Sequence, residues 1–189
     1  MKKQIGSAVV AVIAIVAILV AIAGVAFTGF ISARTYAIDQ ETLIKKVYNN
    51  NKNILGTYTN KVREMAQVPD MYAADLERVM TKVMAARMGD GGSKAVMQWF
   101  QEANIPFDSS MYTKLQQVME AGNNEFQANQ TRLVEVKEDY VQNQQYLWRG
   151  FWMGVAGYPK IDLDEYKIVV AADTEQAFKE GKRDPIKLR

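Results

Sequence analysis

Hydrophobic residues are arranged in two ways along this chain: one continuous run near the N-terminus, and then stripes at helical spacing. The run from Ile5 to Ile31 contains 27 uncharged residues, mostly Ala, Val and Ile. As a helix it would be about 40 Å long, which is enough to cross a hydrocarbon core of about 30 Å with tilt to spare. The pattern therefore predicts a single transmembrane anchor over residues 1–33.

A secretory signal and a buried core helix are the two alternatives to an anchor. A signal peptide also begins with basic residues such as Lys2 and Lys3, but its apolar region spans only roughly 7–15 residues. A core helix would need more apolar surface around it than the remaining residues offer. The chain has no cysteine, which excludes a lipoprotein-type lipid anchor.

The charges that flank the apolar run bear on its topology. The pair Lys2 and Lys3 favours a cytoplasmic N-terminus, and Arg34, Lys45 and Lys46 on the other flank nearly balance it. We expect a single-pass protein of the cell (inner) membrane. The small difference between the flanks favours a main domain outside the cytoplasm.

Prolines and a glycine-rich turn at residues 89–92 divide the rest of the chain into helical segments at 34–68, 70–88, 93–104 and 108–148. In the first and last segments, seam positions alternate at spacings of four and three, which is typical of helices that pack along one another. These positions are Ile44, Tyr48, Asn51, Leu55, Tyr58, Val62 and Met65, and then Leu115, Met119, Gly122, Phe126, Asn129, Leu133, Val136, Tyr140, Asn143 and Leu147. The predicted fold class is mainly α, an N-terminal transmembrane helix followed by an elongated antiparallel helical bundle over residues 34–158.

The ends of these segments carry further expectations. Asp70 is the expected N-cap of the second segment, and Asp108, Ser109 or Ser110 could cap the last. No proline occurs before Pro69, so the anchor should continue almost directly into the first bundle helix. The C-terminal extension, residues 159–189, is expected to contain a short strand from Tyr166 and then a short helix.

Three seam positions of the predicted bundle are polar: Asn51, Asn129 and Asn143. A buried asparagine at such a position is satisfied only opposite another polar group, and it can therefore fix the register of two helices. The alternative is that the seam faces water locally, or that these residues pair with glutamine or backbone. The sequence favours neither interpretation.

Aromatic residues gather where the last long helix should end, and Trp148, Phe151 and Trp152 are the central ones. They could form an aromatic cap that closes the end of the bundle, which is the interpretation we prefer. They could instead form an amphipathic belt against the bilayer interface or a partner.

Small residues recur at spacings of three and four within the apolar run, at Ala14, Ala17, Ala21 and Gly24. Such a stripe lets transmembrane helices approach closely and is a common means of association. It predicts packing between copies of this helix, although an alanine-rich helix acquires such stripes easily by chance.

The amino-acid composition limits which catalytic and metal-binding functions the chain can have. The chain has no histidine and no cysteine, which removes the usual zinc and copper ligands, the common catalytic nucleophiles and the commonest general base. The acidic group Asp162, Asp164 and Glu165 lacks the glycine and the spaced ligands of a calcium loop. We therefore predict no enzymatic activity, no cofactor and no metal site.

Charge argues against nucleic acid as a partner. The chain has 23 Lys and Arg residues and 21 Asp and Glu residues, and setting Lys2 and Lys3 aside leaves 21 of each. No basic face is implied, and phosphate binding needs one.

The order of parts resembles the LemA family of bacterial membrane proteins. An N-terminal anchor is followed by Tyr48-Asn49-Asn50, by a helix ending Lys82-Val83-Met84-Ala85-Ala86-Arg87, by Tyr112-Thr113-Lys114-Leu115-Gln116, and by Asn124-Glu125-Phe126 with Arg132, Tyr140 and Asn143. Gln67-Val68-Pro69-Asp70 stands where the family has an arginine-rich, Leu-Ile-Pro-Asn-like signature, and the segment after Pro159 also differs. A divergent, phage-encoded member would have this pattern. The resemblance implies a helical bundle on a membrane and little about mechanism.

These observations lead to a hypothesis and an alternative. The hypothesis is a membrane-anchored, non-enzymatic scaffold or interaction protein whose partners are membrane lipid, further copies of itself and an unidentified protein. The alternative is a sensory or signal-relaying bundle on the same anchor, with a partner that supplies the output.

Overall fold

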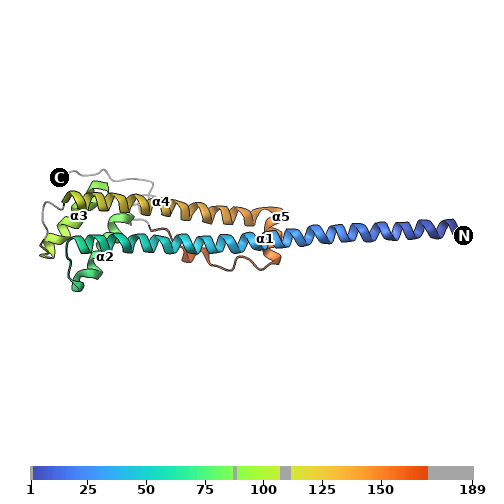
Figure 1. The fold of residues 1–189 in the computed structure, drawn as a ribbon, viewed down its shortest axis with the longest axis horizontal. Helices are drawn as coiled ribbons and strands as arrows, with labels where there is room; N and C mark the ends of the chain where they lie inside the picture. The colour runs from blue at the N-terminus through green and yellow to red at the C-terminus, as the bar shows by residue number, and fades with distance from the viewer. Residues whose placement is uncertain (1, 87–88, 107–111, 170–189) are drawn as a thin grey trace, which may run out of the picture. The chain divides into compact units, whose positions relative to one another are not determined.

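The computed structural model of the chain describes residues 2–86, 89–106 and 112–169. Within these residues the protein is mainly helical and has no strand. The chain divides into two compact units: unit 1 is Met1–Leu43 with Val136–Leu163, and unit 2 is Ile44–Glu135 with Asp164–Arg189. Two long helices, α1 (Lys2–Met65) and α4 (Tyr112–Gln145), contribute residues to both units (Figure 1).

Helix α1 is continuous over 64 residues and includes the whole apolar run. The expectation that no break separates this run from the following helix is therefore confirmed. The helix ends where Gln67 adopts a left-handed conformation with φ 48°. The backbone N–H of Val68 then donates to the carbonyl of Arg63 at 2.9 Å, which satisfies a carbonyl at the helix end.

Two other helices end in the same way. After α3 (Gly89–Glu102), Asn104 has φ 52°, and the N–H of Ile105 donates to the carbonyl of Phe100. After α5 (Leu147–Val155), Gly157 has φ 75°, and the N–H of Tyr158 donates to a carbonyl in α5. Asparagine and glycine tolerate this conformation best, so these two ends are encoded locally.

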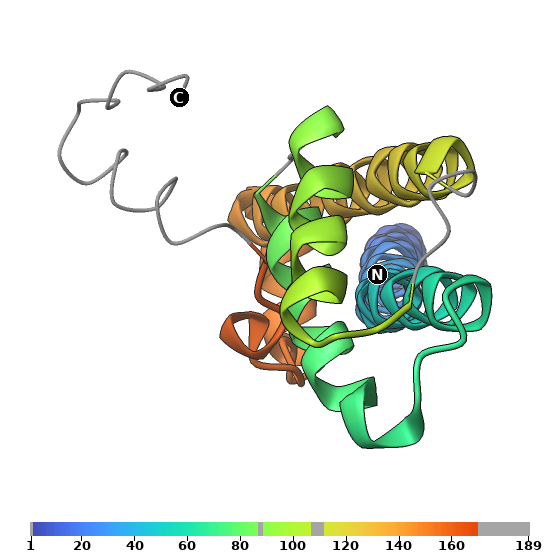
Figure 2. The same ribbon diagram turned by 90° about the vertical axis from the view of Figure 1, so that its left-hand side faces the viewer.

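Unit 2 is organised around one hydrophobic core. Helices α2 (Ala73–Ala85) and α3 pack against each other (Figure 2). Together with parts of α1 and α4 they bury a continuous apolar cluster, which includes Ile54, Tyr58, Val62, Leu76, Met80, Met84, Val96, Phe100, Leu115, Met119 and Phe126. Burial of each large side chain stabilises the fold by about 1.5–3 kcal/mol.

Within unit 2, α1 and α4 run antiparallel. Asn51 contacts Asn129, and further along α1 Tyr58 contacts Glu125. Gly122 permits this close approach, because a Cβ atom there would lie 2.6 Å from the ring of Tyr58.

Unit 1 contains the first part of α1, the end of α4, α5 and the segment after it. Its buried apolar residues are Ala33, Ala37, Tyr140 and Met153. The buried stripe on α1 thus begins at Ala33, well before Ile44, the first seam position that we identified from the sequence.

The prediction of one long helix over 108–148 is wrong at its end. Helix α4 stops at Gln145, Tyr146 is extended, and α5 begins at Leu147. Leu147 is therefore 93% exposed and does not belong to the seam. Gly150 makes the break possible, since a Cβ atom there would lie 1.9 Å from the carbonyl oxygen of Gln144.

Three other local predictions are wrong. Asp70 is not the N-cap of α2; it opens a short 3-10 helix, η1 (Asp70–Tyr72), and its carboxylate pairs with Arg63. The glycines at 89–92 begin α3 instead of forming a turn. Residues 166–169 do not form the expected strand. The rest of that segment, the helix after it and the caps proposed at 108–110 lie outside the described residues.

Candidate functional site

The apolar stretch of α1 is long and apolar enough to cross a membrane, and it is exposed. Its exposed large side chains are Val9, Val10, Val12, Ile13, Ile15, Val16, Ile18, Leu19, Val20, Ile22, Val25 and Phe27. Leaving these groups in water would cost on the order of tens of kcal/mol. This surface therefore requires an apolar environment that the described part of the chain does not supply.

The small residues of this stretch share that exposure. Ala14, Ala17, Ala21 and Gly24 are all exposed, and a Cβ atom added to Gly24 would contact nothing within 4 Å. No described part of the chain packs on this stripe.

An aromatic cluster packs on α1 at the end of the apolar stretch. Trp152 stacks edge-on against Phe30, with ring centroids 6.4 Å apart, and contacts the rings of Trp148 and Phe151 within α5. Gly29 makes room for the indoles, because a Cβ atom there would lie 2.7 Å from Nε1 of Trp152 and 2.9 Å from Trp148. The three aromatic residues singled out in the sequence are thus brought together, and two of them, Trp148 and Trp152, lie against α1.

One face of α5 is largely exposed in the described structure, although Trp148 on it also contacts α1. We call it the outer face of α5, and it consists of Leu147, Trp148, Phe151 and Val155, which are 93%, 56%, 59% and 55% exposed. Spacings of one, four and eight residues place these side chains within about 100° of each other around the helix axis.

The opposite side of α5 carries its only charge. Arg149 donates to the side-chain oxygen of Asn143, and its guanidinium lies 4.6 Å from the ring centre of Tyr36. Tyr36 in turn donates to the carboxylate of Asp139 at 2.6 Å. Burial, and then the hydrogen bond to Asp139, raise the pKa of Tyr36.

Asn143 is buried, but its hydrogen bonds run along α4 and into α5. Its amide nitrogen donates to the backbone carbonyl of Asp139 at 2.8 Å, and its oxygen accepts from Arg149. Asn143 therefore braces the α4–α5 turn.

A buried carboxylate joins three parts of unit 1. Glu41 on α1 is 6% exposed, and it accepts the phenol of Tyr140 at 2.7 Å and the backbone N–H of Lys160 at 2.6 Å. Burial, and then the bond to Glu41, raise the pKa of Tyr140. The carboxylate is enclosed, so its role is to hold α4 and the segment after α5 onto α1.

The two other seam asparagines meet each other in unit 2. The amide nitrogen of Asn129 donates to the side-chain oxygen of Asn51 at 2.8 Å and to the carbonyl of Val47 at 2.9 Å. Its oxygen accepts from Asn50 at 3.0 Å. One asparagine thus uses three of its four hydrogen-bonding positions between two helices.

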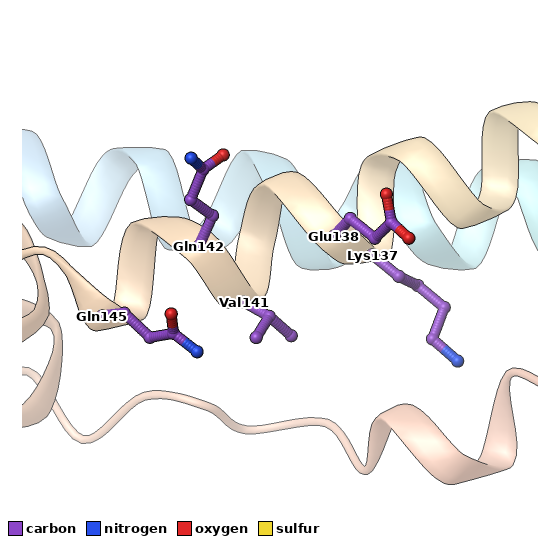
Figure 3. A pocket seen from close by; sticks show the side chains of 5 residues that line it. All are labelled: Lys137, Glu138, Val141, Gln142 and Gln145. Carbon is purple, nitrogen blue, oxygen red and sulfur yellow. The ribbon is translucent and has the colours of Figure 1, made fainter.

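A shallow hollow on α4 is lined by Lys137, Glu138, Val141, Gln142 and Gln145 (Figure 3). All five come from one helix. The described residues also contain no group of three or more His, Cys, Asp or Glu that could hold a metal ion.

Sequence reasoning missed Glu41, Tyr36 and Gly29. A signal existed for Glu41, because steps of three and four backward from Ile44 reach Glu41 and then Ala37. A charged residue on that stripe was not recognised as part of the seam. For Gly29 no local signal exists, since the indoles that need it are far away in the sequence.

Comparisons with known proteins identify no relative of this chain. No family model matches the chain, and neither a curated protein nor a solved structure matches it.

Proposed function

We propose that this protein is a single-pass membrane protein whose α1 provides the anchor and whose remaining helices form an antiparallel bundle beside the bilayer. The observation that carries the proposal is the exposed apolar surface of α1 from Val9 to Phe27. It is long enough for the hydrocarbon core, and all its backbone groups are satisfied within one helix, as lipid requires.

The bundle is proposed to act as a self-associating scaffold of LemA-like type. Support comes from the exposed small-residue stripe at Ala14, Ala17, Ala21 and Gly24, which suits close packing of helices in lipid. The absence of histidine and cysteine favours a structural role over catalysis. The Lys2 and Lys3 pair favours a cytoplasmic N-terminus, which would put the bundle outside the cytoplasm. The membrane that holds the anchor is proposed to be the inner membrane of a bacterial cell.

An alkaline wash of membranes tests the anchor. The full chain should stay in the pellet with integral proteins. Chemical cross-linking in the same membranes tests self-association and should give discrete multiples of the 21.3 kDa chain. Release into the supernatant would refute the anchor, and a strict monomer in membranes would refute the scaffold.

A second candidate is a relay of signals across the membrane. The observation in its favour is the unbroken α1, which passes from the apolar stretch into the core of unit 2, since helical elements can transmit small shifts. A small molecule that raises the melting temperature of the purified chain would favour the relay over the scaffold.

A further inference from the structure

Helix α5 has apolar side chains on its outer face and its charged side chain on its inner face, the reverse of a helix on a water-exposed surface. Its single charged residue, Arg149, points into unit 1 and is held by Asn143 and Tyr36. Its outer face presents four large apolar side chains. A helix that covers a core normally has the opposite arrangement.

The position of α5 along α1 offers a physical reason for this exposed apolar face. Its tryptophans pack on Gly29, where the exposed apolar surface of α1 continues through Phe27 and Ile31. The first charged side chain after this stretch is Arg34, about one turn later. The outer face of α5 thus adjoins the end of the anchor, where a bilayer surface would lie.

We propose that the outer face of α5 lies in the headgroup region of the bilayer and fixes the depth of α1 at Phe30. This inference rests on the proposed function, because it needs α1 to be an anchor. Tryptophan and phenylalanine are residues that this region accepts, with tryptophan enriched there, and interfacial helices bury their apolar faces about 5–10 Å deep.

The length of α1 agrees with this depth. From Phe30 back to Lys3 is 27 residues, or about 40 Å of helix. A bilayer with its headgroup regions is about 40–45 Å thick. Lys2 and Lys3 therefore reach the opposite headgroup region when Phe30 lies at the near one.

A second protein copy is a weaker candidate for the same face. The four side chains offer on the order of 500 Å², whereas a stable protein interface buries about 800 Å² on each partner. Lipid needs no such minimum area, and it already surrounds the adjoining surface of α1 if that helix is an anchor.

The absence of cysteine permits a clean test. Leu147→Cys and, as a control in the same unit, Glu138→Cys would each carry a nitroxide label in the full chain, reconstituted into phosphatidylcholine vesicles. Both positions are exposed, so neither label disturbs packing. We expect the label at 147 to be more accessible to oxygen than to a water-soluble nickel complex, and the label at 138 to show the reverse.

The outcomes separate this inference from the proposed function. If alkaline washing leaves the chain in the vesicles and the label at 147 is open to nickel, α5 lies in water and the inference fails while the anchor stands. Dipolar coupling between labels at 147, with both reagents excluded, would assign the face to a second copy and also overturn the inference. Release of the chain by the wash would instead refute the anchor.

Tryptophan fluorescence provides an independent measurement that leaves α5 unchanged. The chain has three tryptophans, so Trp99→Phe leaves Trp148 and Trp152. We expect lipids brominated near the headgroup end of the acyl chain to quench their emission by half or more, and lipids brominated deeper to quench less. Emission that is the same in both brominated lipids and in unbrominated lipid would overturn the inference.

Discussion

The phenol of Tyr140 donates a hydrogen bond of 2.7 Å to the carboxylate of Glu41, and both side chains are buried in unit 1. The same carboxylate accepts the backbone N–H of Lys160. One acidic group thus holds together α1, α4 and the segment after α5. A buried carboxylate that loses a partner keeps its desolvation cost, so the stability of unit 1 depends on this contact.

Tyr140→Phe should lower the free energy of unfolding by about 1–3 kcal/mol, because it leaves Glu41 buried with one partner fewer. Denaturant unfolding of the full chain in detergent would measure the loss. Adding Glu41→Gln should recover part of it, since a neutral amide costs less to bury than a charge. Tyr146→Phe is the matched control at an exposed position, and it should change stability by no more than about 0.5 kcal/mol. Equal losses at Tyr140 and Tyr146 would contradict the role of Glu41.

Alkaline pH should weaken the same contact. Burial and the bond to Glu41 hold the pKa of Tyr140 above its ordinary value, which is about 10 in an unfolded chain. The stabilisation is therefore complete below about pH 10 and is lost as the pH rises from there toward the folded pKa. Burial and the bond to Asp139 likewise raise the pKa of Tyr36, so Tyr36 contributes in the same direction. Unfolding midpoints should fall above about pH 10, and more gently in Tyr140→Phe; an unchanged slope in that variant would contradict the prediction.

The helical stripes could be found from the sequence because burial follows the period of a helix. Val62, Leu115 and Leu133 are buried, as their spacing requires. The apolar run of α1 could also be found from the sequence, because its residue composition alone marks where it begins and ends. Each of these features depends on one segment alone, so it can be recognised without knowing which other segments pack against it.

The break between α4 and α5 could not be found in this way. The stripe continues in sequence to Leu147, but the chain turns at Tyr146 because Gly150 can approach the carbonyl of Gln144. Glu41 was missed for a similar reason. A carboxylate is expected to be exposed until its partner, here Tyr140, is known.

The asparagine pair of unit 2 should show energetic coupling. Asn129→Leu leaves the oxygen of Asn51 without its donor, and we expect a loss of about 1–3 kcal/mol. The double variant Asn51→Leu with Asn129→Leu removes both partners, so it should lose less than the sum of the two single variants. Denaturant unfolding of the four proteins gives this coupling. Additive losses would mean that the contact at 2.8 Å contributes nothing specific.

Gly29 and Gly24 provide a matched comparison on one helix. Alanine favours a helix over glycine by about 1 kcal/mol at either site. At Gly24 no described residue lies near the new Cβ atom, whereas at Gly29 it would meet Trp152 and Trp148. In the Trp99→Phe background, Gly29→Ala should therefore shift the tryptophan emission and lower the melting temperature, and Gly24→Ala should leave the emission unchanged. Identical spectra for both variants would show that α5 does not pack on Gly29.

The small-residue stripe of α1 gives the most direct test of self-association. Ala17→Leu with Ala21→Leu should separate helix backbones that pack there and weaken assembly by about 1–2 kcal/mol, because helix contacts in membranes are modest. Insertion should be unaffected or improved, since leucine is the more favourable residue in a bilayer. The control is Ile15→Leu with Leu19→Ile on the opposite face of the helix, which keeps composition and volume. Cross-linking in intact membranes should show fewer multimers for the alanine variant only. An unchanged ladder would mean that the stripe is only a consequence of alanine-rich composition, and that any association comes from the helices outside the membrane.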